Sequence, residues 1–511
     1  MVNQRTNSPI IEKSRVEALV CGITPVSSVV LRTINGSDLR INLCGFWDLS
    51  RDAVLPSDIS KLKRIEGPFE DIANNKKFDV IFLCLPPQLQ FKLLKTFWSK
   101  HSSGTGQLQT ATEMDADYPH IVLVPPVSPC YSARFLQEVR NTVCIAMPLR
   151  RMRPISVLHQ HLASVVHPLT LSSLRKNLSL PSHWTLGKVR SFHARLHTVS
   201  HVQSSQYSWL CESGVMGGGL LNIYGAGLID IAFLLTGGLQ LTSVSCLSRT
   251  FDVESKGYSS SIRRNSADDY MLIIGELENK TPSDSNFNEK RGPVAMFCLS
   301  SDLPPLSSSV IEDGTHQFNL SIEISGSSGQ FVLPESCDRI CWLPLRISNT
   351  DGKTSSRPSS QPAFSPGDLD GIGDPPILNG GLQSDPSAKL SSHLGHLGVQ
   401  SGHSSPLDQQ TVRIEKMGNC TEVAYLNTKN SSEEAGSNNS VQNKSLNPVQ
   451  DAWLNWLSQL SMSLRQVPRK HGLDLLVATP EHWGYIQRVL IAIEKAARLR
   501  CWIDVTTGEK L

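Results

Sequence analysis

Residues 78–90 read FDVIFLCLPPQLQ, and this stretch decides the fold of the first part of the chain. The run FDVIFLCL at 78–85 is apolar almost throughout, which is typical of a strand that is covered on both sides. Pro86 and Pro87 end the strand, and QLQFKLLKTFWSK continues as a helix. A buried strand that leads at once into a helix indicates a parallel β-α arrangement.

The same pattern recurs on both sides of this stretch. Apolar runs lie at 16–21 (VEALVC), 40–46 (RINLCGF), 120–124 (HIVLV) and 142–147 (TVCIAM), with room for helices between several of them. The alternation predicts a doubly wound, Rossmann-like α/β domain of the nucleotide-binding kind over residues 15–148, preceded by a disordered N-terminus at 1–14.

The pattern changes after residue 148. A helix is expected at 155–164, a strand at 188–199, and a glycine-rich turn that opens an apolar helix at 217–237. Four strand candidates follow, namely SVSCLSRTF, DYMLIIGEL, VAMFCLS and FNLSIEIS, and the chain ends with two helices at 451–467 and 482–499 and an edge strand at 501–505. Runs of strands with few helices predict an α+β second domain with a mostly antiparallel open sheet, built from residues 149–347 and 447–511.

Residues 348–446 are dominated by Ser, Gly, Pro, Asn and Asp, as in SSRPSSQPAFSPGDLDGIGDPP. Such a composition buries too little apolar surface to offset the entropy of ordering, so we predict a disordered insertion that offers a place for an unknown protein partner. One short interruption, TVRIEKM at 411–417, can form a strand.

Composition excludes several functional classes. The net charge is +2 and charged residues make up 18% of the chain, which gives no reason to expect nucleic acid as the partner. The 12 cysteines include no CxxC pair and no metal-ligand spacing, so reduced thiols are expected. No run approaches the ~20 apolar residues of a membrane span, and the polar start MVNQRTNSPIIEKSR has no signal-peptide core. Cytoplasmic residence is the default expectation, with an extracellular role left open.

Four segments resemble the family of glucose–fructose oxidoreductase and inositol dehydrogenase. They are MGGGLLNIYGAGLIDIAFLLTG at 216–237, HWGYIQRVLIAIEKAARLRCWIDV at 482–505, FDVIFLCLPPQLQ at 78–90 and SIEISGSSGQFVL at 321–333. YSWLC at 207–211 and SADD at 266–269 are similar to the animal branch of that family, the glucose–fructose oxidoreductase domain-containing proteins. The resemblance implies NADP or NAD as cofactor and a homodimer through the sheet of the second domain.

The cofactor-binding candidates follow the strands of the first domain. A dinucleotide site uses G-x-G-x-x-G after the first strand, but here only Gly22 remains of it, with Thr24 as a possible hydroxyl donor and Pro25 without a backbone N–H. Asp48 follows the second strand, where an acid accepts hydrogen bonds from ribose. The resemblance adds Leu85, Pro86 and Pro87, whose turn lines the cofactor groove in the family. A plain turn at Gly22, an ordinary surface acid at Asp48 and a proline turn without a ligand are the alternatives.

The catalytic residues of the family are missing, so we predict none in this chain. The family's Glu-Lys-Pro position reads VPPV at 124–127, its helix Asp falls on Ile223, and its His falls on Gly227. The helix's last Asp matches Asp230, for which a packing or capping role is expected. Tyr224 is one place from the lost Asp, but a phenol with a pKa near ~10 is a poor base.

Two basic or titratable groups of residues have no assigned role. His193 and His197 share one face of a predicted strand, and packed or solvated histidine is the ordinary alternative to catalysis. Arg150, Arg151 and Arg153 suit a phosphate, an acidic partner or a salt bridge between the domains.

These observations leave three readings open. The first is a nucleotide-binding, oxidoreductase-like protein whose catalysis is impaired. The second is an active NAD(P)-dependent oxidoreductase on a sugar or polyol. The third is a non-catalytic scaffold that binds partners.

Overall fold

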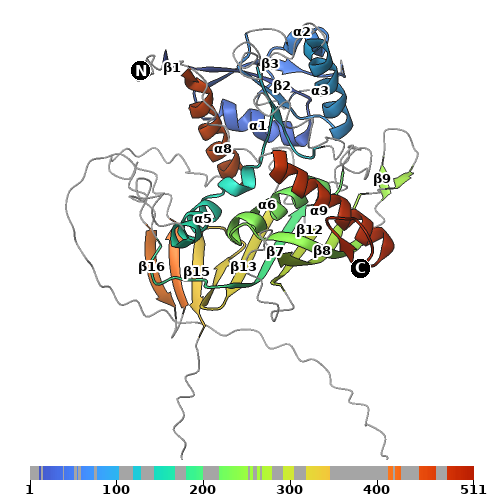
Figure 1. Cartoon of the computed structure of the whole chain (residues 1–511). Coiled ribbons are helices and arrows are strands. Elements are labelled where there is room, and N and C mark those ends of the chain that lie inside the picture. The colour runs from blue at the N-terminus through green and yellow to red at the C-terminus, as the bar shows by residue number, and fades with distance from the viewer. Residues whose placement is uncertain are drawn as a thin grey trace, which may run out of the picture. The chain divides into compact units, whose positions relative to one another are not determined.

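A computed structural model of the chain contains a parallel sheet with helices and a larger mixed sheet (Figure 1). The structure describes residues 11–12, 15–37, 39–50, 55, 59–73, 77–102, 119–127, 143–166, 180–199, 218–250, 254–256, 262–264, 267–278, 292–303, 318–345, 412–417, 421–426, 448–467 and 480–511. All of them fall within one compact unit that comprises Met1–Leu345 and Gln410–Leu511, whereas the second unit, Arg346–Gln409, lies outside the described residues. The domain boundaries drawn from the sequence stay a prediction.

The first sheet is parallel throughout. Its order is β3-β2-β4-β5-β6, with β2 at Val16–Cys21, β3 at Ile41–Trp47, β4 at Val80–Leu83, β5 at His120–Leu123 and β6 at Val143–Ile145. A single parallel bridge from Phe46 to Arg64 extends the edge beyond β3. The order is therefore that of a six-stranded doubly wound sheet whose third strand is reduced to one bridge. The predicted Rossmann-like fold class is confirmed.

The strands of the first sheet alternate between two buried layers. Leu19, Ile81 and Leu83 belong to one apolar cluster, whereas Ala18, Val20 and Phe82 belong to another. Because a strand turns successive side chains to opposite faces, both faces must be covered. Helix α1 at Pro25–Asn35 and helix α3 at Pro87–Ser102 follow β2 and β4, and the short helix α2 lies at Phe69–Ala73.

The second layer is completed by a helix from near the end of the chain, α8 at Pro448–Arg465. Its buried side chains share a cluster with α1 and β2; they are Trp453, Trp456, Leu457, Leu460 and Leu464. Ser461 also donates a hydrogen bond to the carbonyl of Leu39 at 2.7 Å. The fold of the first sheet thus depends on residues more than 400 positions away.

The second sheet has the order β16-β17-β15-β14-β13-β7-β12-β11-β8-β19 and is antiparallel except for the pair β12 and β7. The strands lie at Val189–Val199 (β7), Gln240–Arg249 (β8), Tyr270–Glu278 (β11), Val294–Leu303 (β12), Phe318–Gly326 (β13), Gly329–Leu333 (β14), Arg339–Pro344 (β15), Val412–Met417 (β16), Thr421–Leu426 (β17) and Ile503–Asp504 (β19). Figure 1 shows α5 (Arg153–Val166), α6 (Ala226–Leu235) and α9 (Pro480–Leu499) on one face of this sheet. The expected α+β second domain with an open sheet is confirmed.

Part of the segment 348–446 forms strands: the strand expected at 411–417 is found at Val412–Met417 (β16), whereas a second strand at Thr421–Leu426 (β17) was not expected. Strands β16 and β17 form an antiparallel hairpin that extends the second sheet beyond β15. Val423 and Ala424 are buried at 1% and 0% exposure. The hairpin therefore pairs with the edge of β15, a long-range pairing that local composition does not reveal. Apart from this hairpin, residues 348–446 lie outside the described part, as does the predicted N-terminal segment except for Ile11–Glu12 (β1), which pairs with Gln466–Val467 (β18).

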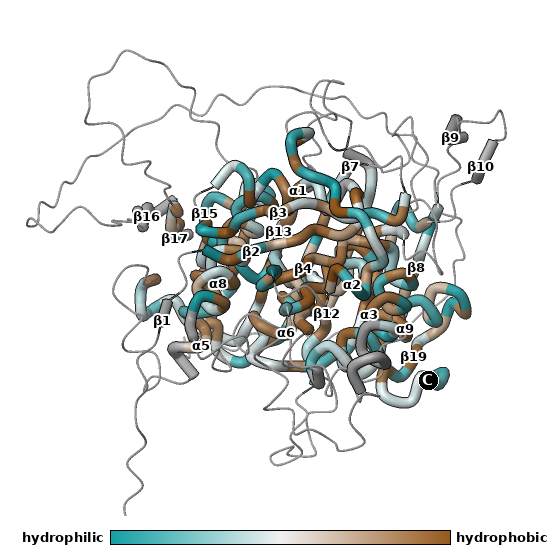
Figure 2. Tube along the Cα trace, turned by 90° about the horizontal axis from the view of Figure 1, so that it is seen from above, coloured by the Kyte–Doolittle hydropathy of each residue, from teal (hydrophilic) through white to brown (hydrophobic). Residues whose placement is uncertain are grey.

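Hydropathy follows this architecture. Figure 2 shows hydrophobic residues gathered along β4, α6 and β12, with hydrophilic residues toward the outer turns. Two short strands, Glu254–Lys256 (β9) and Ile262–Arg264 (β10), pair only with each other. Among the described helices, none combines the length and apolar character that crossing a membrane requires.

Candidate functional site

The carboxyl ends of β2 and β4 meet at the point where the order of the parallel sheet reverses, which is where doubly wound proteins bind ligands. Gly22 follows β2 with φ +92° and donates its N–H to the carbonyl of Trp47 at 2.8 Å. A Cβ atom at this position would lie 2.6 Å from Leu85 Cδ2 and 2.8 Å from the carbonyl oxygen of Cys84. Glycine is therefore required both by the left-handed backbone and by the close approach of Leu85. The structure thus brings the candidates Gly22 and Leu85 together.

The turn that follows Gly22 satisfies most of its own hydrogen-bond donors. Thr24 is the N-cap of α1: its hydroxyl accepts from the Ser27 N–H at 3.1 Å, and the Ser27 hydroxyl accepts from the Thr24 N–H at 2.8 Å. The hydroxyls of Ser27 and Ser28 donate to the carbonyl of Thr24. This reciprocal capping box holds the first turn of the helix. It also uses several donors with which a glycine-rich loop would otherwise bind a phosphate.

Asp48, just after β3, points at the same turn. Its carboxylate accepts the Ile23 N–H at 2.6 Å on Oδ2 and the Ser50 N–H at 2.7 Å on Oδ1. Each carboxylate oxygen has a second lone pair, so the side chain keeps the capacity to accept hydroxyl donors.

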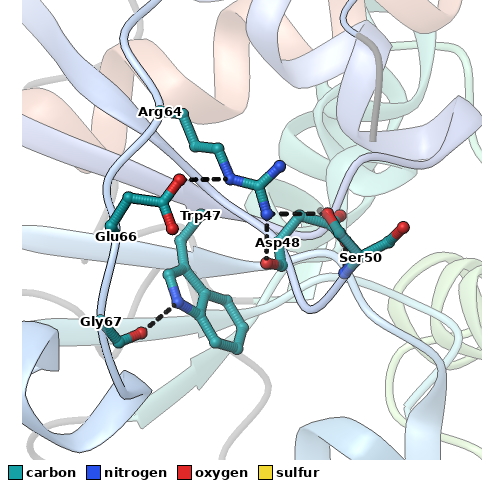
Figure 3. A network of polar contacts seen from close by, with 6 residues as sticks. All are labelled: Trp47, Asp48, Ser50, Arg64, Glu66 and Gly67. Atoms are coloured by element: carbon teal, nitrogen blue, oxygen red, sulfur yellow. Dashed lines mark hydrogen bonds and ion pairs between the residues drawn. The ribbon is translucent and has the colours of Figure 1, made fainter. Parts of the chain in front are cut away.

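A network around Asp48 fixes this corner of the sheet (Figure 3). The Arg64 guanidinium donates to the carbonyls of Asp48 at 3.1 Å and Ser50 at 2.8 Å, and it pairs with Glu66 at 3.1 Å. The indole of Trp47 donates to the carbonyl of Gly67 at 2.9 Å. The loop after β3 is therefore tied to the single bridge that replaces the missing third strand.

Pro86 and Pro87 form the turn between β4 and α3, as expected, and both are buried. The side chain that joins this turn to the next one is Gln90, which was not among the predicted binding residues. Its Nε2 donates to the carbonyls of Leu85 at 2.8 Å, Val124 at 2.9 Å and Pro126 at 3.3 Å. Its position one helical turn into α3, facing the sheet, was the available sequence signal.

The residues present fit one end of a dinucleotide better than the other. Asp48 supplies the acceptor that a ribose diol needs, and Gly22 opens the edge of the sheet. The N–H groups of Ile23 and Thr24 have intramolecular acceptors, and Pro25 has no N–H to offer a pyrophosphate. The ribose end therefore fits, whereas the phosphate end has few backbone donors left.

The helix of the second half carries no proton-transfer group at the two positions matched to the family. It begins with a π-helical turn, η7 at Leu221–Gly225, and continues as α6. Ile223 packs against the main apolar cluster. A Cβ atom at Gly227 would lie 2.8 Å from Leu149 Cδ1, so the Leu149 side chain occupies the space that a side chain at 227 would need.

Tyr224 lies beside these positions but is buried. Its hydroxyl lies 3.4 Å from the Thr198 hydroxyl on β7, and burial raises the pKa of the phenol despite that hydrogen bond. A phenol with a raised pKa keeps its proton at neutral pH. Tyr224 is thus part of the packing between the helix and the sheet.

Asp230 is the centre of a buried ionic cluster. Arg150, in the short helix η3 at Pro148–Arg151, donates to both of its carboxylate oxygens at 2.9 and 2.6 Å, and His482 Nε2 lies 2.8 Å from Oδ1. Burial alone would raise the pKa of Asp230, but the Arg150 charge and the hydrogen bonds from His482 and Arg150 outweigh it, and the pKa is lowered. The sequence left a phosphate site and a salt bridge as alternatives for the basic run; the structure pairs Arg150 with Asp230.

A second acid, Asp268, caps the start of the same helix. Its carboxylate accepts the Leu221 N–H at 3.0 Å, and a Cβ atom at Gly219 would lie 2.2 Å from its Oδ1. Gly219 has φ +97°, so the last glycine of the run is required by both backbone and space. Burial is the main cause that raises the pKa of Asp268 to about 6.

The strand histidines belong to the sheet face away from these helices. Phe192, Ala194 and Leu196 are buried, so the alternating His193 and His197 lie on the opposite face. His197 Nδ1 is 2.7 Å from the Ser300 hydroxyl. Within the described residues, no group of three His, Cys, Asp or Glu side chains is placed to hold a metal ion.

Comparison with known proteins shows a likeness of fold. No protein-family model matches the chain, and no curated protein does. An NAD-binding oxidoreductase from Klebsiella pneumoniae is 12% identical with a TM-score of 0.53, the match covering 97% of this chain and 100% of that one. An oxidoreductase from Sinorhizobium meliloti is 10% identical with a TM-score of 0.52, and an oxidoreductase domain protein from Kribbella flavida is 12% identical with a TM-score of 0.51; both matches cover 96% of this chain and 100% of the other. At these identities the likeness establishes the two-sheet oxidoreductase fold, the architecture expected from the four resembling segments.

Proposed function

We propose that this chain is an oxidoreductase-like protein that binds NADP or NAD at the carboxyl edge of its first sheet and is catalytically impaired. Gly22, Thr24, Asp48, Leu85, Pro86 and Pro87 are the residues proposed to line that site. A bound dinucleotide would supply a hydride donor or acceptor, and the chain's own residues would bind and orient it. The similarity of fold to the NAD-binding protein from Klebsiella pneumoniae supports the choice of ligand.

One observation carries the impairment: Leu149 fills the space beside Gly227. Hydride transfer to or from a sugar alcohol needs a general acid or base within hydrogen-bond reach of the reacting hydroxyl. The turn at 124–127 presents valine and proline, and Ile223 is apolar. A lost proton carrier whose place stayed open could be replaced by water, whereas here Leu149 Cδ1 lies 2.8 Å from where the Cβ of a side chain at 227 would be.

The resemblance to the animal branch of glucose–fructose oxidoreductase domain-containing proteins belongs to this proposal. Of its two supporting segments, YSWLC at 207–211 lies outside the described residues. In SADD at 266–269, Asp268 caps the helix start, and Asp269 accepts from the Ser301 hydroxyl at 3.0 Å. Asp268 thus has a structural role at the glycine run, and Asp269 has one at strand β12.

The test is a titration of the purified full chain with NADP(H) and NAD(H), followed by calorimetry and by thermal shift. Leu49, which is 53% exposed beside Asp48, is changed to Glu to place a negative charge at the proposed site. Ile491→Glu, at a position 48% exposed on α9, is the matched surface control. We expect saturable binding that Leu49→Glu weakens and Ile491→Glu leaves unchanged. No binding at millimolar dinucleotide would overturn the proposal and leave the reading of a partner-binding scaffold.

The impairment is tested separately by a screen of sugars and polyols with both cofactors. We expect no turnover of dinucleotide above that of a heat-denatured sample. Turnover that saturates with one substrate would instead establish the active oxidoreductase.

We also propose a homodimer through the open face of the second sheet. Leu247 on β8 and Val294 on β12 are 44% and 42% exposed on the face opposite α6 and α9. Arg195 and Glu323 lie on this face of the neighbouring strands β7 and β13, so one patch carries both charges that a two-fold interface can pair. Light scattering of the wild type is expected to give a dimer, and Leu247→Glu with Val294→Glu a monomer. A monomeric wild type would rule the interface out.

A further inference from the structure

We propose that Gln90 is a positioning residue that holds two proline turns together and so sets the shape of the dinucleotide edge. The inference rests on the proposed function for its ligand. Its structural basis is independent of that function, because it is the set of contacts that one buried amide makes.

Gln90 lies on the first turns of α3 and is 0% exposed. Its Nε2 reaches the carbonyl of Leu85, in the turn that follows β4, and the carbonyls of Val124 and Pro126, in the turn that follows β5. Along the chain, Leu85 is five residues from Gln90, whereas Val124 and Pro126 are 34 and 36 residues away. One side chain thus bridges the carboxyl ends of two adjacent parallel strands.

The direction of the amide follows from these contacts. The reverse orientation would point Oε1 at three carbonyl oxygens within 3.3 Å, an arrangement of acceptors without a proton between them. In the orientation found, Oε1 accepts no hydrogen bond from the described residues. The side chain therefore acts through its two N–H groups.

The prolines explain why a side chain is needed there. Pro86 and Pro87 in one turn and Pro125 and Pro126 in the other have no backbone N–H, so the two turns contain few main-chain donors for the carbonyls of Leu85, Val124 and Pro126. A buried carbonyl without a donor costs free energy. Gln90 supplies what the four prolines cannot, and it does so at the edge where Leu85 meets Gly22.

The consequence concerns the ligand edge. Leu85 packs on Gly22 through its side chain, and its carbonyl is held by Gln90. If the amide is lost, the two turns lose their common donor and the Leu85 contact can shift. We expect affinity for the dinucleotide to fall even though Gln90 itself is too deeply buried to touch it.

Two substitutions test this role. Gln90→Met keeps the length of the side chain but removes the donors, and dinucleotide affinity is expected to fall roughly tenfold because buried carbonyls are left unpaired. Gln90→Glu makes the effect depend on pH. A carboxylate among carbonyls is disfavoured, so the introduced acid keeps its proton in mild acid, donates one hydrogen bond and binds nearly as the wild type does. At alkaline pH the affinity of this variant is expected to fall well below that of the wild type.

The control is Leu94→Ala, which removes a fully buried side chain from the same helix one turn further along and leaves Gln90 and its three carbonyl partners unchanged in sequence. Affinity is measured by calorimetry with the oxidised dinucleotides across the pH range, and stability by thermal shift. Leu94→Ala is expected to lower the melting temperature but to leave the dinucleotide affinity unchanged. The ratio of its affinity to that of the wild type should therefore be the same at every pH.

The outcomes separate the two proposals. If the wild type binds no dinucleotide, the proposed function fails. If the wild type binds and Gln90→Glu follows the wild-type pH profile, or Leu94→Ala loses as much affinity as Gln90→Met, then the positioning role is wrong while the proposed function stands.

Discussion

The edge around Gly22 and the helix that follows Gly219 differ in the kind of contact that each makes. At the Gly22 edge, polar groups remain and bond to one another, as Asp48 and Thr24 do with the Ile23–Ser27 turn. Along the helix, Ile223 and Gly227 lie in apolar packing, with Leu149 against Gly227. A polar edge can exchange internal hydrogen bonds for those of a ligand, whereas a packed core must first open a space. This contrast is the basis on which we propose dinucleotide binding with impaired catalysis.

The largest effect is expected at the ionic cluster that stabilises the packed region. In Arg150→Ala, Asp230 keeps its place with 1% side-chain exposure but loses both guanidinium bonds. Removing one partner of a buried ion pair costs about 3–5 kcal/mol, and we expect a loss at the lower end of this range because His482 Nε2 still lies 2.8 Å from Oδ1. Urea unfolding followed by circular dichroism measures the loss, and Arg150→Lys is expected to recover part of it because a lysine keeps the charge but not the paired geometry.

The pH dependence of that loss has a definite sign. The folded-state pKa of Asp230 is lowered, so its ion pair stabilises the fold fully above the unfolded pKa near ~3.9 and loses that contribution as the pH falls through the lower folded value. The difference between wild type and Arg150→Ala should therefore be constant near neutrality and shrink in acid. A difference that grows in acid would contradict the assignment.

The next effect tests whether the packed region can be reopened. Gly227→His restores the residue type of the family but forces the ring against Leu149, and overpacking of this kind costs about 1–3 kcal/mol. Shortening the neighbour in Leu149→Ala/Gly227→His should recover part of the stability. A double-mutant cycle is expected to give a favourable coupling of about 1 kcal/mol or more. Additive effects would mean that Leu149 does not hold the space.

Features that depend on local sequence could be predicted, whereas features that depend on contacts between distant segments could not. The runs at 78–85 and 16–21 predicted buried parallel strands correctly, because apolar patterning is local and strands of this type need cover on both faces. The role of Gly22 in the turn could also be predicted, because it depends only on the strand that directly precedes the glycine in the sequence.

Contacts between distant segments could not be predicted from the spacing of residues along the chain. Leu149 and Gly227 are 78 positions apart, and nothing in either segment indicates that the Leu149 side chain occupies the space beside Gly227. The bond from Asp48 to the Ile23 N–H and the pairing of the 412–426 hairpin with β15 are of the same kind. In each case the contact depends on the three-dimensional fold and not on the local sequence.

A smaller effect is expected at the cap of the helix. The folded-state pKa of Asp268 is raised to about 6, above the unfolded value near ~3.9, so its ionisation destabilises the fold as the pH rises from about 4 to about 6 and the penalty stays constant above that. Asp268→Asn keeps an oxygen to accept the Leu221 N–H. We expect the variant to be more stable than the wild type by about 1 kcal/mol at pH near 8 and equal to it near pH 4. Thermal unfolding at both pH values measures this, and a variant that is less stable at the higher pH would show that the charge itself is needed for the cap.

The smallest effect on stability, and the sharpest on binding, is expected at Asp48. Asp48→Asn keeps one oxygen for the Ile23 N–H, loses the acceptor of the exposed Ser50 N–H bond, and removes the negative charge beside the proposed ribose position. A carboxylate there favours a free ribose diol and repels a 2′-phosphate, so the substitution should weaken NAD and assist NADP, shifting the ratio of their affinities by roughly tenfold toward NADP. Calorimetry with both dinucleotides gives the ratio, whichever of the two the wild type prefers, and thermal shift without ligand should show little change. If the ratio of the NAD and NADP affinities stays as it is in the wild type, then Asp48 serves only to hold the turn after Gly22 and does not contact the ribose.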